Sequence, residues 1–197
     1  MSYKLITAPT TTPITLAETK AHLRVDSPDE DALITALIDA ATARFDGPTG
    51  ILGRALMPQT WDLFLDVFPA EPAIKLPFPP LASVTGVYYF DAVTEAEATF
   101  AAANYEVDTY SIPGWVQLAA DASWPEIMET INAVRVRFVA GYASAAAVPA
   151  PIKAAMLLMI GDLFEHRETA VVGASASAIP LSATIQALTD PYRVTWA

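Results

Sequence analysis

The feature that most constrains the fold is a proline-bounded apolar segment, Val148 to Glu168, with the sequence VPAPIKAAMLLMIGDLFEHRE. At helical spacing, apolar residues fill one side of this segment and much of the opposite side as well. The first side comprises Ile152, Ala155, Met156, Met159, Ile160, Leu163 and Phe164, and the other comprises Ala154, Leu157 and Leu158. Such a helix must be buried from several directions. Two alternatives follow: a central core helix, or a helix packed partly against its own fold and partly against a neighbouring subunit.

The composition describes a compact globular chain with many loop boundaries. Hydrophobic residues make up 53% of its 197 residues, with 16 prolines and 8 glycines. The apolar run Ala154 to Ile160 is far shorter than the roughly 20 residues that span a bilayer, so we expect no membrane partner. The first residues lack the apolar centre of a signal peptide, and we expect the protein to reside in the cytoplasm. The absence of cysteine excludes disulfides, thiolate metal sites and cysteine nucleophiles.

The net charge of −11 is concentrated in the middle of the chain. Between Pro58 and Asn132, eleven acidic residues accompany a single base, Lys75. A surface this negative repels phosphate backbones and cannot release counterions in the way that drives binding to DNA. Solubility alone is the other explanation for the charge.

The order of local signals predicts helices at both ends and strands between them. Capping boxes begin two helices, at Thr15 to Glu18 and at Ser27 to Glu30, and the second helix stops near Asp46-Gly47-Pro48. From Thr60 the apolar period changes to two. The further strand candidates are Ile74 to Leu76, Val84 to Phe90, Asn104 to Thr109, Trp115 to Leu118 and Ala133 to Val139. Helix returns at Pro151 and again from about Leu181 to Leu188.

This pattern predicts an α+β fold. Residues 1–57 and 140–197 are expected to form one helical layer, because apolar helices far apart in sequence need one another's faces. Residues 58–139 are expected to form an acidic antiparallel β region inserted between them. The segment Thr169 to Ala178 is rich in glycine, alanine and serine and is expected to be a loop. Residues 190–197 are expected to form a C-terminal docking tail.

No compact catalytic motif occurs in the chain. Nucleotide-binding glycine loops, the zinc protease motif and the serine hydrolase elbow are all absent. His22 lies among basic residues of a helix, and His166 lies at a helix end where a cation favours the dipole. The acids near Asp29 lack the spacing of a calcium loop. We therefore predict no catalytic residue, cofactor or metal site.

The pieces together resemble the head-tail connector (adaptor) proteins of long-tailed bacteriophages and of phage-derived particles such as gene transfer agents. The resemblance covers most of the chain and depends on the order of its motifs. These are Ile14 to Val25 (ITLAETKAHLRV), Asp29 to Ile34 (DEDALI), Thr60-Trp61, Leu76 to Leu81 (LPFPPL), Val134 to Tyr142 (VRVRFVAGY) and Pro149 to Ala155 (PAPIKAA).

The resemblance implies a structural protein without catalysis. Such adaptors form a ring, commonly of twelve copies, beneath the portal protein at the capsid vertex, and they present a surface to stopper or tail-terminator proteins. DNA passes through the ring without specific binding. The protein is then expected in the virion or particle, at the head-tail interface, and in the host cytoplasm before assembly.

Two sets of residues are candidates for this role. Contacts with neighbouring subunits or the portal are assigned to Ile152, Met156, Met159, Leu163, Tyr192, Arg193 and Trp196. A chain end with two aromatic residues and an arginine has the composition of a binding anchor, although it can also fold back on its own helices. The acids Asp62, Asp66, Glu95, Glu97, Glu106 and Asp108 either line the channel or face outward.

Three other functions compete with this one. A tail-side ring component, such as a stopper or tail terminator, would bind a different face. A small acidic hydrolase would need a pocket with two carboxylates in the β region, and no pair of acids stands out in the sequence. A DNA-mimic module is suggested only by the charge.

Overall fold

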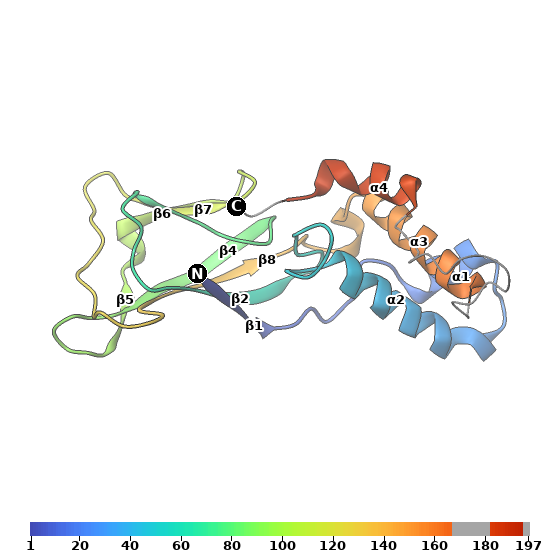
Figure 1. Ribbon diagram of the computed structural model, residues 1–197, viewed down its shortest axis with the longest axis horizontal. Helices are drawn as coiled ribbons and strands as arrows, with labels where there is room; N and C mark the ends of the chain where they lie inside the picture. The colour runs from blue at the N-terminus through green and yellow to red at the C-terminus, as the bar shows by residue number, and fades with distance from the viewer. Residues whose placement is uncertain (167–181, 195–197) are drawn as a thin grey trace, which may run out of the picture. The chain divides into compact units, whose positions relative to one another are not determined.

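The structure is a computed structural model that describes residues 1–166 and 182–194. The described chain divides into two compact units (Figure 1). The β unit contains residues 1–10 and 57–143, and the helical unit contains residues 11–56, 144–166 and 182–194. Helices from both ends of the chain share one unit, and the strands of the other unit are antiparallel, so the predicted α+β class is confirmed.

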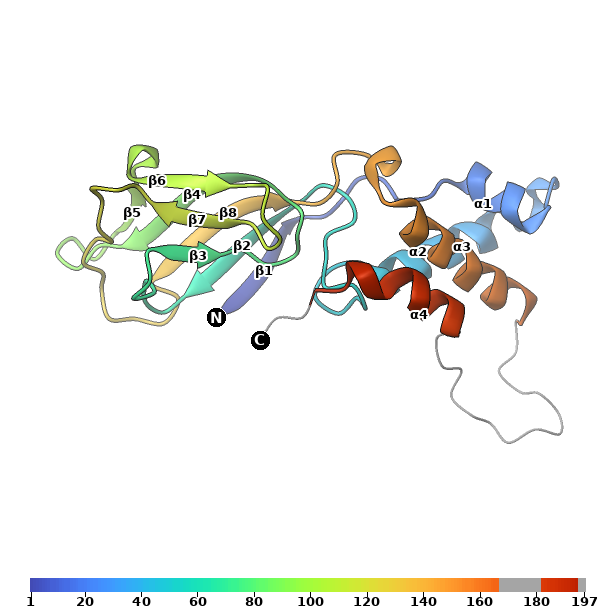
Figure 2. The ribbon, with the colours of Figure 1, turned by 90° about the horizontal axis from the view of Figure 1, so that it is seen from above.

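Two antiparallel sheets stack to form the β unit (Figures 1 and 2). The larger sheet has the strand order β1-β2-β8-β4-β5, and the smaller sheet has the order β3-β7-β6. The strands are β1 Ser2–Thr7, β2 Gln59–Leu65, β3 Ala73–Lys75, β4 Leu81–Phe90, β5 Glu97–Phe100, β6 Tyr105–Asp108, β7 Trp115–Leu118 and β8 Val134–Ala140.

The central strand β8 follows the alternation that its sequence predicts. Val134, Val136 and Phe138 are fully buried between the sheets, while Arg135 and Arg137 lie on the opposite, outer face of the larger sheet. Antiparallel pairing to β2 and β4 fixes this register on both sides. Because a slip of one residue would place both arginines in the core, the pairing is strongly specified.

Two strands were not predicted. β1 lies within the first ten residues, which sequence reasoning assigned to the helical layer, and it forms one edge of the larger sheet. β5 has four residues and forms the opposite edge. It follows a turn in which Asp91 accepts hydrogen bonds from the amides of Val93 and Thr94 at 3.0 and 2.8 Å.

The helical unit contains four α-helices among the described residues. They are α1 Leu16–Leu23, α2 Asp31–Phe45, α3 Ala150–Glu165 and α4 Ala183–Thr189. The capping box of Thr15 and Glu18 is present at the start of α1. Ser27 instead caps a short 3-10 helix, Pro28–Glu30, that precedes α2. α2 ends at Phe45, as the following Gly47 predicts, because that glycine adopts a φ of +70°.

None of the helices in residues 1–166 and 182–194 is both long enough and apolar enough to cross a membrane.

Candidate interaction surfaces

The apolar helix α3 is covered largely by its own unit. It packs against α1, α2 and α4, and the side chains of Ile152 and Met156 are 0% exposed. These two residues belong to the core of the subunit, so the folded subunit cannot offer them to a neighbour or to the portal. Met159 and Leu163 are half-buried and keep a surface that a partner can reach. Their role as an interface stays a prediction.

The described part of the C-terminal segment is attached to the helical unit. Nε of Arg54 donates a hydrogen bond to the carbonyl of Tyr192, and the amide of Val194 donates to the carbonyl of Leu52 at 2.9 Å. Arg54 is itself buried, with 6% of its surface exposed. Up to residue 194 the segment therefore folds back on its own unit.

Two other residues were predicted as contacts at the C-terminal end, Arg193 and Trp196. The side chain of Arg193 is 52% exposed, and its guanidinium lies 3.5 Å from the carboxylate of Asp190. Trp196 lies outside the described residues, as does the predicted loop Thr169 to Ala178.

Asp62 is the one predicted acidic surface residue that the structure buries. Its side chain is 4% exposed and accepts two hydrogen bonds of 2.8 Å from the guanidinium of Arg137. A second guanidinium, that of Arg135, lies 3.6 Å away. Arg135 also pairs with Glu97 at 2.8 Å and lies 4.0 Å over the ring of Tyr88. Asp62 therefore holds the outer face of the larger sheet together and does not belong to an exposed acidic surface.

The remaining predicted acids lie near the surface of the β unit. Asp66, Glu95 and Glu106 are exposed. Asp66 accepts a hydrogen bond of 2.8 Å from the amide of Asn132. Whether these carboxylates line a channel or face outward stays a prediction.

Asp108 has a local structural role in the hairpin between β6 and β7. Its carboxylate accepts hydrogen bonds from the hydroxyl of Ser111 at 2.5 Å, from the amide of Tyr110 at 2.8 Å and from the indole of Trp115 at 2.7 Å. These bonds, that of Ser111 foremost, lower the pKa of Asp108 from 3.8 to about 2. The hairpin therefore presents Tyr110, which is 96% exposed, on a turn with a fixed conformation.

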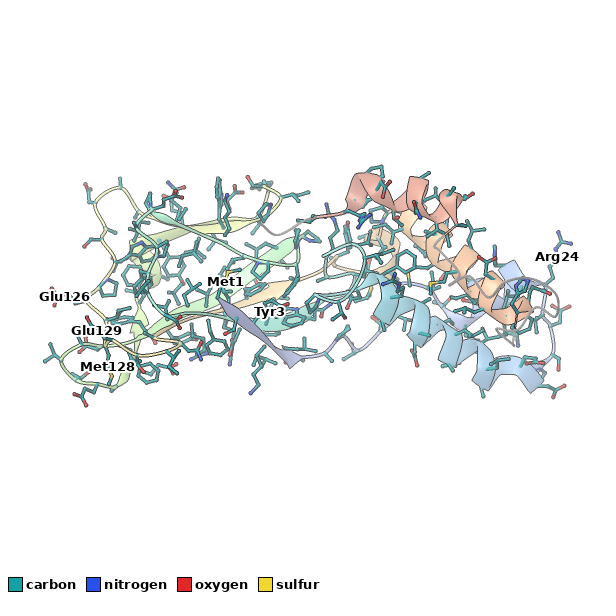
Figure 3. All side chains as sticks on the ribbon, viewed as in Figure 1. Met1, Tyr3, Arg24, Glu126, Met128 and Glu129 are labelled. Carbon is teal, nitrogen blue, oxygen red and sulfur yellow. The ribbon has the colours of Figure 1, made fainter. Side chains whose placement is uncertain are left out.

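Sequence reasoning missed the exposed edge of β1. Every residue of this strand is exposed, including the large apolar side chains of Tyr3, Leu5 and Ile6 at 45%, 40% and 39%. Figure 3 labels Tyr3 on this strand. The alternation of Tyr3 and Leu5 with Lys4 was the signal available in the sequence, but the run is short and is followed by a polar, proline-containing segment.

In the part of the chain that the structure describes, no group of three or more histidine, aspartate or glutamate side chains is placed to hold a metal ion. The carboxylates with lowered pKa values serve turns and helix caps, as those of Asp91, Asp108 and Glu18 do. These carboxylates therefore have structural roles.

Comparisons with known proteins give matches to phage connector and particle neck proteins. Residues 13–88 match the family described as "Phage gp6-like head-tail connector protein". A chain from the "Neck of empty GTA particle computed with C6 symmetry" matches with a TM-score of 0.77 and 26% identity, over 100% of this chain and 97% of that chain. A chain from the "Virion of native gene transfer agent (GTA) particle" gives 0.75 and 27%, with the same coverage.

A chain from the "Neck of native GTA particle computed with C12 symmetry" has the same fold, with a TM-score of 0.67 at 22% identity over 100% of this chain and 97% of that chain. No curated protein matches the sequence. The resemblance to head-tail connectors that the sequence indicates is therefore confirmed. The family match and the structural neighbours are structural connector and neck proteins.

Proposed function

We propose that this protein is the head-tail adaptor of a phage-like particle. In this role, copies of the chain form a ring under the portal at the capsid vertex, and the ring joins the capsid to the tail. The observation that carries the proposal is the match over the full length of this chain to a chain in the neck of a gene transfer agent particle. The connector family match over residues 13–88 supports it independently.

The ring is proposed to contain twelve copies, the number that the connector resemblance implies. The C6 and C12 symmetries under which the similar particle necks were computed are both compatible with this number. The acidic β unit supports the passage of DNA without specific binding, since net negative charge repels phosphates. The subunit is proposed to reside in the host cytoplasm until it joins the particle.

The portal contact is proposed to involve the C-terminal end. Deletion of the whole segment 190–197 is a poor test of this idea. It would remove the Tyr192 carbonyl that pairs with the buried guanidinium of Arg54, and unfolding could then mimic lost binding. A sharper variant deletes only residues 195–197, and Arg193→Ala is its point-substitution partner.

The experiment that tests the function is co-sedimentation with the portal ring encoded in the same gene cluster. We expect a complex with near-equal numbers of the two subunits. Deletion of 195–197 is expected to weaken it, whereas Asp39→Asn, on the exposed side of α2, should not. If an intact portal fails to bind while stopper or tail proteins do bind, the chain is instead a tail-side ring component.

A further inference from the structure

The β unit has two opposite lateral edges. β1 and β3 lie along one side, and β5 and β6 lie along the other (Figure 2). Ring contacts within the unit agree with this view. Tyr3 of β1 lies 4.9 Å from Phe78, which follows β3, and Phe100 of β5 stacks on Tyr105 of β6 at 6.0 Å. Both sheets of the sandwich thus end together at each side.

These two edges carry opposite charge. Four basic side chains occur in the β unit. Two of them, Arg135 and Arg137, lie on the central strand β8 and form ion pairs with Glu97 and Asp62, respectively. The other two are Lys4 on β1 and Lys75 on β3, and both are exposed. We call this side the basic edge.

The opposite side carries Glu106 on β6 and Glu95 in the turn before β5. Glu97 on β5 also lies there, but its carboxylate is already paired with Arg135 at 2.8 Å. All three glutamates are exposed. We call this side the acidic edge.

At both edges, side chains on the inward-facing side of a sheet, the side that forms the core of the β unit, are partly exposed. Tyr3 pairs in register with Leu63, and Val107 pairs with Val116, and both partners are fully buried. Tyr3 and Val107 are nevertheless 45% and 38% exposed. A further strand on each side would bury these edge residues.

The strand directions favour one kind of repeat. Each step across the larger sheet is antiparallel, and an even number of steps separates β1 from β5, so these two strands run in the same direction. The same holds for β3 and β6 in the smaller sheet. A rotation about an axis along the strands preserves this direction and can extend both sheets at once.

We propose that the basic edge of one copy docks on the acidic edge of the next copy, so that β1 meets β5 and β3 meets β6 around the ring. The proposal rests on the ring of the proposed function and names its intersubunit surface. Lys75 and Glu106 both lie on the outer face of the smaller sheet, two residues apart in register, so their long side chains can meet diagonally across the contact. A two-fold contact of β1 with β1, centred on the strand, is disfavoured because it would bring the Lys4 side chains of the two copies close together.

Charge exchange at this pair tests the surface. Lys75→Glu alone and Glu106→Lys alone are each expected to weaken self-association at least about tenfold, measured by sedimentation velocity, because each places like charges in contact. The double variant Lys75→Glu/Glu106→Lys restores the opposite charges and should recover most of the loss. Matched controls in the helical unit are Arg24→Glu, whose side chain is labelled in Figure 3, and Asp39→Lys. Equal loss in these controls, or no rescue in the double variant, would overturn the proposal.

Cross-linking tests the same contact directly, since the chain contains no cysteine. Ser2 and Thr99 are the ends of one row of side chains across the outer face of the larger sheet, through Phe64, Arg135 and Tyr88. With a short bismaleimide, Ser2→Cys/Thr99→Cys should give a ladder beyond the dimer. A mixture of the two single variants should give dimers only.

The cross-linking result and the portal-binding result are interpreted independently. Dimers from Ser2→Cys alone would indicate a two-fold β1 contact and refute the head-to-tail surface. No ladder, with the protein free and with the portal ring present, would refute it as well, even if the portal binds. A ladder without portal binding would support the surface and count against the adaptor function.

Discussion

Replacing Asp62 by asparagine tests whether this residue is structural. The change keeps the shape of the side chain but removes the charge that two guanidinium groups share. Asp62 is 4% exposed, with two hydrogen bonds of 2.8 Å to Arg137. Removal of one partner from a buried ion pair typically costs about 3 to 5 kcal/mol. Because the side chain of Arg137 is 34% exposed and can recover some hydration, we expect a loss of about 3 kcal/mol in the free energy of unfolding of the β unit.

The assay is urea unfolding followed by tryptophan fluorescence, because Trp61, Trp115 and Trp124 all lie in the β unit. With an m-value of about 2 kcal/mol/M, the midpoint should fall by about 1.5 M. Glu106→Gln is the matched control. It changes an exposed acid and should alter stability by less than about 0.5 kcal/mol.

A double-mutant cycle with Arg137→Gln isolates the pair. The two single changes should each be costly, and the double variant should lose clearly less than their sum, with a coupling of about 1.5 kcal/mol or more. A loss below about 1 kcal/mol for Asp62→Asn would refute the reasoning, since it would show that the carboxylate is well solvated in the folded protein.

Three further predictions concern local structure. Gly141 adopts a φ of +117°, and a Cβ there would lie 2.2 Å from a backbone oxygen, so Gly141→Ala should destabilise the β unit by more than about 1 kcal/mol in the same urea assay. The pKa of Glu18 is lowered from 4.5 to about 2, chiefly by its hydrogen bond from Lys153 at 2.6 Å. The stability that the ionised Glu18 contributes is complete above pH 4.5 and is lost as the pH falls toward 2. The difference in the free energy of unfolding between the wild type and Glu18→Gln, followed by circular dichroism, should therefore shrink over that range. At neutral pH this difference should be below about 1 kcal/mol, because the ion pair is partly exposed. Asp108→Ala should speed hydrogen exchange at the amide of Tyr110 while leaving the amides of β8 protected; unchanged exchange would show that the turn does not depend on the carboxylate.

The sequence alone predicted local structure at positions where particular residue types favour one backbone conformation. The capping box of Thr15 and Glu18, the end of α2 before Gly47 and the alternation of β8 all follow from near neighbours in the chain. The order of such signals also indicated the connector resemblance, because motif order needs no three-dimensional information.

Only the tertiary structure decided what each apolar or charged side chain meets. The sequence left open whether the apolar helix was a core helix or an interface, and packing against α1, α2 and α4 places Ile152 and Met156 in the core. Asp62 resembled any other acid of the middle segment until its strand was paired with β8 and brought to Arg137. Pairing between strands distant in sequence depends on contacts that no local period encodes. For the same reason the basic and acidic edges, with Lys75 on one and Glu106 on the other, became visible only once the strand order was known.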